Sequence, residues 1–295
     1  MKKTLFTGAG VAIVTPFNED KSVNFDALAK MIDFQIENGT DAIIICGTTG
    51  EASTLTDDEQ VETIRFTAEH TKKRVPVIAG AGSNDTAHGI NLAKRCENAG
   101  VDGLLIVTPY YNKTTQRGLV KYYSTIAGSV DVPIIMYSVA GRTGLNIAPE
   151  TVKELSKIEN IVALKEASGN ISQVAAIAAR CGDDIDIYSG NDDQILPVLS
   201  LGGKGVISVL SNVAPKDTHD MVMKFLNGDV KGAKEIQLKA IELISALFCE
   251  VNPIPVKAAL NMMGMNAGGY REPLIELSDE HYKSVEAAMK NYGLI

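Results

Sequence analysis

The sequence has no tryptophan, few aromatic residues (5%) and only four cysteines among its 295 residues. Cys46, Cys96, Cys181 and Cys249 lie too far apart in the chain to form a C-x-x-C motif or the spacing of a zinc site. We therefore expect them to be small buried hydrophobic residues of a protein in a reducing compartment.

Blocks of basic residues and long apolar runs are missing as well. With 28 basic and 36 acidic residues the net charge is -8, so a nucleic acid backbone would be repelled and nucleic acid is not an expected partner. No apolar run approaches the roughly 20 residues of a membrane span. The start, Met1-Lys2-Lys3 and an apolar stretch, imitates a signal peptide but lacks a clear small-x-small cleavage site. We expect a cytoplasmic protein.

Several catalytic motifs are absent. His70, His88, His219 and His281 form no H-E-x-x-H or other close metal pattern, which disfavours a metal hydrolase. No G-x-S-x-G segment indicates a serine hydrolase, and no G-x-G-x-x-G after a strand indicates a nicotinamide cofactor. We expect neither a metal nor a cofactor.

Eight short apolar runs rich in Val and Ile divide the first two thirds of the chain. Because they are continuously apolar, they are typical of strands that are buried on both faces, as in a parallel sheet covered by helices. The runs are 11–14, 42–46, 75–79, 103–107, 132–137, 161–164, 185–188 and 206–209.

Amphipathic helices with recognisable ends separate these runs. Asn24 can cap a helix that stops at Gly39, and Thr56 with Glu59 forms a capping-box pattern. Eight strand-helix units spaced by about 30 residues predict an α/β fold, a (β/α)8 TIM barrel. An open doubly wound sheet is the alternative, but it would be expected to carry the nucleotide fingerprint that is missing here.

The strands stop near Thr218, and the remaining chain reads as helical. Ile236, Ile241, Ile244 and Phe248 recur at helical spacing, Asn252-Pro253-Ile254-Pro255 interrupts the pattern, and Ser278 opens a last helix. We predict a barrel domain over residues 1–224 and a helical C-terminal domain over residues 225–295.

In such barrels the reactive groups gather where the strands end. Lys165 follows the apolar run 161–164, so its amine is expected near the mouth of the barrel. A desolvated amine is more often neutral, as attack on a carbonyl to form a Schiff base requires. The alternative is that Lys165 pairs with Glu166 or extends into solvent.

Other strand ends carry groups that suit a small carboxylate substrate. The Gly47-Thr48-Thr49-Gly50-Glu51 turn can present N–H groups and hydroxyls to an anion, or can simply open a helix. Tyr111 and Tyr137 can relay protons or pack. Arg142 can bind a carboxylate or form a surface ion pair.

Four motifs, in this order, resemble the dihydrodipicolinate synthase family, and the resemblance covers the whole chain. They are Gly47-Thr48-Thr49-Gly50-Glu51, Val107-Thr108-Pro109-Tyr110-Tyr111-Asn112, Tyr137 with Gly141-Arg142-Thr143-Gly144, and Ala163-Leu164-Lys165-Glu166-Ala167-Ser168-Gly169. The family is expected to be cytoplasmic and to make a precursor of diaminopimelate and lysine.

The resemblance implies a mechanism without a cofactor. Lys165 would condense with the ketone of pyruvate, whose carboxylate the turn of Thr48 and Thr49 would hold. Tyr137 would carry protons through Thr48 to Tyr111, which in the family reaches in from the neighbouring subunit.

The second substrate implied is aspartate semialdehyde, with Arg142 binding its carboxylate. Gly190 and Ile207 match positions that line the pyruvate pocket. The resemblance also implies a homotetramer built as a dimer of dimers. If Tyr111 completes the site of a neighbouring subunit, the protein must be at least a dimer.

This chain departs from the family pattern in two places. Ser138 and Ala140 stand where Asn and Pro are usual, and the lost proline is expected to loosen the loop that aims Arg142. Asn84 and Tyr110 match positions that lysine-inhibited members use to bind lysine. Where those members often carry His this chain has Asp57 and Gln60, and where they carry Glu it has His88. The loss of one acidic partner for the amine of lysine disfavours inhibition by lysine.

Two alternatives remain at this point. A related aldolase such as N-acetylneuraminate lyase shares the fold and the lysine, and one altered loop can redirect specificity. A catalytically silent barrel that only binds a keto acid is the other, although such a protein has no chemical reason to keep Lys165, Tyr137, Tyr111 and Thr48 together.

Overall fold

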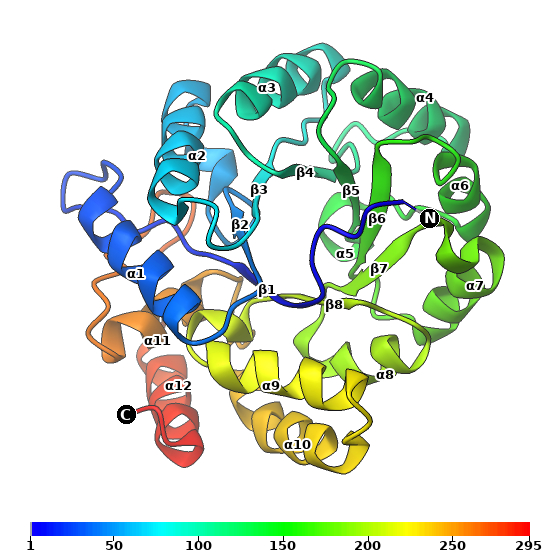
Figure 1. Cartoon of the computed structure of the whole chain (residues 1–295). Coiled ribbons are helices and arrows are strands. Elements are labelled where there is room, and N and C mark those ends of the chain that lie inside the picture. The colour runs from blue at the N-terminus through cyan, green and yellow to red at the C-terminus, as the bar shows by residue number, and fades with distance from the viewer. Residues whose placement is uncertain (1) are drawn as a thin grey trace.

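Eight parallel strands close into one barrel in chain order, so the predicted (β/α)8 fold is confirmed (Figure 1). The computed structural model describes residues 2–295. The strands are β1 (Gly8–Ala12), β2 (Ala42–Ile45), β3 (Val77–Gly80), β4 (Gly103–Val107), β5 (Ile134–Ser138), β6 (Ile161–Glu166), β7 (Asp186–Ser189) and β8 (Gly205–Ser208).

Helices cover the outside of this barrel. They are α1 (Phe25–Glu37), α2 (Asp57–Thr71), α3 (Thr86–Asn98), α4 (Gln116–Ala127), α6 (Pro149–Leu155), α7 (Ile171–Cys181), α8 (Ile195–Ser200) and α9 (Pro215–Leu226). Short helical turns follow several strands: η1 (Ala52–Thr54), α5 (Ala140–Thr143), η3 (Asp192–Gln194) and η4 (Leu210–Asn212). A further turn, η2 (Gly182–Asp184), lies between α7 and β7.

Two of the expected helix ends are present as predicted. The Asn24 side chain accepts a hydrogen bond from the Ala27 N–H at the start of α1. Thr56 and Glu59 form a complete capping box at the start of α2, each side chain satisfying the other's backbone N–H. Because both caps involve only residues close together in the chain, they can be predicted from the sequence alone.

The first strand is the one whose position was predicted wrongly. The apolar run 11–14 indicated a strand there, whereas β1 begins at Gly8 and ends at Ala12. Its early residues pair with β8, and the N–H of Ala9 donates to the Asp41 carboxylate at 2.7 Å. Gly8, Ala9 and Gly10 have small side chains, so hydropathy does not reveal a strand that is nevertheless fully buried.

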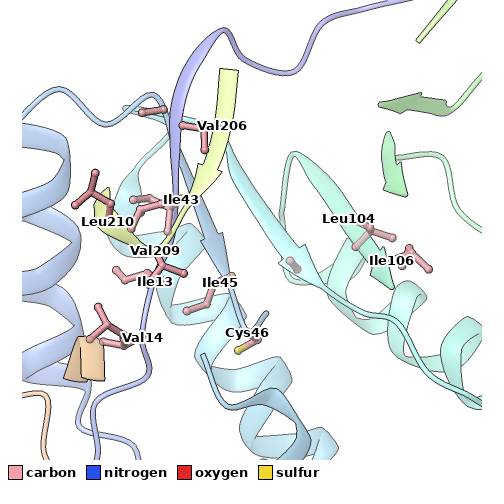
Figure 2. Packing of buried hydrophobic residues seen from close by; sticks show 14 of the residues in the cluster. Ile13, Val14, Ile43, Ile45, Cys46, Leu104, Ile106, Val206, Val209 and Leu210 are labelled. Atoms are coloured by element: carbon pink, nitrogen blue, oxygen red, sulfur yellow. The ribbon is translucent and has the colours of Figure 1, made fainter. Parts of the chain in front are cut away.

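Side chains alternate between two apolar layers along each strand. Ile43 and Ile45 point outward into the layer beneath the helices, where they lie near Ile13 and Val209 (Figure 2). Ala42 and Ile44 point into the barrel and belong to a smaller inner cluster. Within that cluster the rings of Phe6 and Tyr188 stack at 4.3 Å between centroids. The inside of the barrel is thus a packed core rather than a pore.

The C-terminal segment adds α10 (Val230–Ala246), α11 (Ile254–Met262) and α12 (Asp279–Tyr292). Helix α10 packs on α9, and α12 packs on α10 and α11 (Figure 1). The boundary between a barrel domain and a C-terminal domain after residue 224 stays a prediction. Helix α9 runs across this boundary. No helix within residues 2–295 is long and apolar enough to cross a membrane.

The expected apolar face of the first C-terminal helix is only partly correct. Ile244 is buried, but Ile241 and Phe248 are exposed, and α10 ends before Phe248. The helical spacing of Phe248 was therefore misleading, because this residue lies in the connection to α11.

Candidate active site

A cavity of about 90 Å³ opens where the strands end, and the side chain of Lys165 lines it. Lys165 is the next-to-last residue of β6, and only 6% of it is exposed. It points inward because Ala163, two residues earlier on the same strand, belongs to the inner cluster. A buried primary amine at the mouth of the barrel is the arrangement that carbonyl chemistry requires.

Tyr137 lies beside Lys165. The two residues are direct partners in the parallel register of β5 and β6, and Lys165 Nζ lies 4.3 Å from the centroid of the Tyr137 ring. Tyr137 is buried and lines the same cavity. A phenol can give and take a proton, so a group capable of proton transfer lies next to the amine.

Gly190 leaves the space that Lys165 occupies. A Cβ atom at this position would lie 3.1 Å from Lys165 Cε and 2.6 Å from the Ala167 Cβ. The N–H of Gly190 donates to the Glu166 carbonyl at 2.7 Å, which fixes this close approach. Gly190 is among the residues that line the cavity.

Asp192 holds the loops after β7 and β8 together behind the cavity. One carboxylate oxygen, Oδ2, accepts the N–H groups of Val209 and Leu210 at 3.0 and 2.9 Å. Burial raises the pKa of this carboxyl group above its ordinary value. No sequence motif singled it out.

The turn after β2 forms another wall of the cavity. Thr48 and Thr49 both line it, and Thr49 is buried. Within residues 2–295, the backbone N–H groups of Thr48 and Thr49 have no hydrogen-bond acceptor. Two free N–H groups on a tight turn can bind a carboxylate.

Arg142 approaches the cavity from the single helical turn α5. Its Nη2 donates to the Asn252 carbonyl at 3.1 Å. Asn252 also donates from Nδ2 to Thr49 Oγ1 at 2.9 Å, while its buried Oδ1 has no partner within residues 2–295. Asn252 therefore joins two predicted substrate-binding residues, and sequence reasoning missed it.

Phe248 is another lining residue that was not predicted from the sequence. It lies between α10 and α11, lines the cavity and is 44% exposed. Asn252 and Phe248 come from the C-terminal segment, whose local pattern shows helix breaks but no motif that points to a site.

Two predicted site residues lie elsewhere. Ile207 is buried in the inner cluster and is not among the residues lining the cavity. Tyr111, after β4, has a φ of 67° and is 91% exposed, and it does not line the cavity of its own chain. The structure thus brings together Lys165, Tyr137 and Thr48 but not Tyr111.

Comparison with known proteins identifies the family. The model of the Dihydrodipicolinate synthetase family matches residues 5–292. The chain belongs to this family. A 4-hydroxy-tetrahydrodipicolinate synthase of Lachnoclostridium phytofermentans is 59% identical over 292 residues, which cover 99% of both proteins.

Solved structures of the family agree with this fold. A crystal structure of a dihydrodipicolinate synthase superposes with a TM-score of 0.96 at 48% identity, covering 98% of this chain and all (100%) of the other. The chloride-inhibited dihydrodipicolinate synthase of Acinetobacter baumannii, solved with pyruvate, has a TM-score of 0.97 at 40% identity, covering 99% and 100%. The resemblance inferred from the four motifs is confirmed.

Of the two departures from the usual pattern of the family, Ser138 ends β5 and Ala140 begins α5. Ser138 is buried, and its Oγ contacts Asn146 Oδ1 and the Ile147 N–H, both at 3.2 Å. It thus points away from the inner cavity that Tyr137 faces. Ala140 is the first residue of α5, where the missing proline would have restricted the backbone. The hydrogen bond from Arg142 to the Asn252 carbonyl ties this loop to the C-terminal segment.

A second cavity of about 350 Å³ shares Thr48, Tyr137 and Arg142 with the first. Its other lining residues include Asp57, Gln60, His88 and Tyr110. His88 Nε2 lies 2.9 Å from the Asp57 carboxylate, and Asn84 Nδ2 donates to the Tyr110 carbonyl at 3.3 Å. Asn84 is not among the lining residues. Asp57, the acidic residue that lines this cavity, is thus already paired with His88.

Metal ligands are not grouped in the part of the chain that the structure describes. No three His, Cys, Asp or Glu side chains of residues 2–295 lie close enough together to hold a metal ion. Cys46, Cys96 and Cys181 are buried and Cys249 is half-buried, all as free thiols.

Proposed function

We propose that this protein condenses pyruvate with L-aspartate 4-semialdehyde to give 4-hydroxy-tetrahydrodipicolinate, with Lys165 as the nucleophile. Family membership and relatives of 51–59% identity that carry this activity in their names support the overall reaction. It is a lyase-type carbon–carbon bond formation on the route to diaminopimelate and lysine. The buried amine of Lys165 beside the Tyr137 ring is the observation that carries the residue assignment.

The first half of the reaction uses pyruvate alone. The Lys165 nitrogen attacks the ketone carbon, the oxygen leaves as water, and an iminium forms. Loss of a methyl proton then gives an enamine, with the iminium nitrogen accepting the electron pair. Tyr137 is placed to move these protons, while the Thr48 and Thr49 N–H groups bind the pyruvate carboxylate.

The second half adds the semialdehyde. The enamine carbon attacks the aldehyde carbon, and the aldehyde oxygen takes up a proton to become the hydroxyl group. The amino group of the added substrate then attacks the iminium carbon, so that the ring closes and the free Lys165 amine is released. Arg142, held by Asn252, is positioned for the semialdehyde carboxylate.

The iminium formed on Lys165 serves as the electron acceptor, so the proposed chemistry needs no metal or cofactor. We place the reaction in the cytoplasm. Since Tyr111 is exposed in its own chain, we also propose that it completes the proton relay of a second copy, in at least a homodimer and in the family's tetramer. The pairing of Asp57 with His88 argues against inhibition by lysine.

Reductive trapping tests the assignment of the nucleophile. The protein is incubated with pyruvate and borohydride, and the modified lysine is located by peptide mass spectrometry. Lys165 is expected to be modified, whereas Lys257, which is also buried, is not. Lys165→Ala should abolish trapping and turnover, and the exposed Lys157→Ala serves as the matched control. Trapping at another lysine would refute the assignment.

Substrate choice is tested by following pyruvate consumption. Loss of pyruvate with aspartate semialdehyde, but not with N-acetylmannosamine, is expected. Consumption only with the amino sugar would move the function to a lyase of the neuraminate type, and no consumption with either would indicate a silent barrel. Dialysis against EDTA should leave the rate unchanged.

A further inference from the structure

A buried ion pair lies next to the active-site turn but outside the cavity. Lys257 on α11 is fully buried (0% exposed), and its Nζ donates to Glu51 Oε1 at 2.7 Å and to the Gly269 carbonyl at 2.5 Å. The same Nζ lies 4.3 Å from the centroid of the Phe17 ring. Burial lowers the pKa of Lys257, while Glu51 opposes that shift.

Glu51 is the last residue of the turn that carries Thr48 and Thr49. Its backbone has a φ of 53°, in the left-handed region that disfavours a residue with a side chain. Its second carboxylate oxygen, Oε2, accepts the N–H of Arg271 at 3.2 Å. Both carboxylate oxygens of this strained residue are therefore bound by the C-terminal segment.

Other hydrogen bonds also fix the turn, and two of them run from the Gly50 and Ala52 N–H groups to the Gly47 carbonyl at 3.1 and 3.4 Å. The Gly50 carbonyl accepts a hydrogen bond from Thr15 Oγ1 at 2.7 Å, and Thr49 Oγ1 accepts one from Asn252. Within the turn itself, the Glu51 N–H donates to the Thr48 carbonyl at 3.1 Å. Since the N–H groups of Thr48 and Thr49 face no protein acceptor in residues 2–295, contacts at the edges of the turn must hold them in place.

We propose that the Glu51–Lys257 ion pair is a positioning device that holds the Thr48–Thr49 turn in the geometry that binds the pyruvate carboxylate. This inference rests on the proposed function of that turn. It makes the C-terminal helical segment part of the substrate site, although Lys257 itself does not line the cavity.

A purely structural role is the competing explanation. A buried ion pair often adds little net stability, because the desolvation of two charges offsets their attraction. Removing one partner leaves the other charge buried and alone, which destabilises any fold. Loss of stability therefore does not distinguish the two explanations, whereas a change confined to pyruvate binding does.

The test measures the pyruvate concentration that gives half-maximal borohydride trapping at Lys165, together with the KM values of both substrates. The variants are Glu51→Gln and the double variant Glu51→Gln/Lys257→Met, which removes both buried charges. Val285→Ala is the control, because it removes volume from a fully buried position on a different helix, α12.

Both Glu51 variants are expected to raise the half-saturating pyruvate concentration about tenfold, since a misplacement near 1 Å can cost up to 10²-fold. The maximal extent of trapping and the semialdehyde KM should stay within about twofold, and Val285→Ala should change only the thermal stability.

A folded Glu51 variant that keeps the wild-type pyruvate dependence would overturn the proposal, as would an equal rise in both KM values. Failure of both variants to fold would also overturn it, since the pair would then serve folding rather than the turn. Absence of trapping in the wild type would instead refute the proposed function itself.

Discussion

Lys165 and Tyr137 are direct register partners on neighbouring strands, and the Lys165 Nζ lies 4.3 Å from the centroid of the tyrosine ring. Side chains at paired positions of a parallel sheet point to the same face. The two strands therefore deliver an amine and a phenol to the same cavity without the help of a loop. The ring and the hydroxyl of Tyr137 then have separable roles, because the ring contacts the amine and the hydroxyl can move protons.

Tyr137→Phe separates these roles. The variant keeps the ring that contacts Lys165 but loses the proton-transferring hydroxyl, so kcat should fall by about 10²- to 10⁴-fold. Borohydride trapping of pyruvate should still reach completion, only more slowly. Steady-state kinetics and trapping on the same samples provide the measurement, with the exposed Tyr282→Phe as control. A kcat within threefold of wild type would remove Tyr137 from the mechanism.

Gly190→Ala tests the space around the amine. The added methyl group would lie 2.6 Å from the Ala167 Cβ and 3.1 Å from Lys165 Cε, so the lysine must move. A displacement of the nucleophile should lower kcat/KM for pyruvate by about 10²-fold. Gly128→Ala is the matched control, since its Cβ would lie 3.4 Å from its nearest neighbour at an ordinary φ of -72°. Equal kinetics for the two variants would contradict the packing argument.

The fold could be predicted because its signals are local. Strands buried on both faces are continuously apolar, and the Asn24 and Thr56 caps need only a few neighbouring residues. The exception is β1, whose residues Gly8 to Gly10 have little hydropathy although they lie against β8. These residues are buried because β1 pairs with β8 when the barrel closes, and a short stretch of sequence gives no sign of that pairing.

The site could be predicted only where it coincides with strand ends. Lys165 and Tyr137 follow from their positions at the ends of apolar runs, whereas Asn252, Phe248 and Lys257 do not. Asn252 meets Thr49 across 203 positions, and Lys257 meets Glu51 across 206. Such contacts depend on where α11 packs, and the helix-breaking prolines beside Asn252 carry no chemical signal of their own.

Ser138→Ala tests the consequence of the departure from the family pattern. The Ser138 hydroxyl contacts Asn146 and the Ile147 N–H on the outer side of β5. Its loss should cost about 1 kcal/mol of stability and leave the semialdehyde KM within about twofold. Arg142→Ala, by contrast, should raise that KM by more than tenfold, since hydrogen bonds to a charged group contribute about 1.5–3 kcal/mol. Thermal melts and KM measurements on both variants check this, and a specificity change in Ser138→Ala would refute it.

Glu59 and Arg271 give the fold a defined dependence on acid. Arg271 Nη2 lies 2.6 Å from Glu59 Oε1, and Nη1 lies 3.0 Å from Oε2, so the C-terminal segment holds α2 by a two-pronged ion pair. The hydrogen bond from Arg271 lowers the pKa of Glu59 to about 2. An unfolded glutamate titrates near pH 4.3. The folded state therefore binds this proton less readily than the unfolded chain does.

The stabilisation from Glu59 should thus be complete above about pH 5 and be lost as the pH falls towards 2. Glu59→Gln should lower Tm at pH 7, and the difference from wild type should shrink at pH 4 and again at pH 3. Since the Glu59 side chain is 34% exposed, added salt should reduce the difference as well. Glu62→Gln, which breaks a more exposed pair with Arg65, should show a smaller effect at pH 7. A Tm difference for Glu59→Gln that does not vary with pH would show that the charge of Glu59 contributes nothing and that only its hydrogen bonds matter.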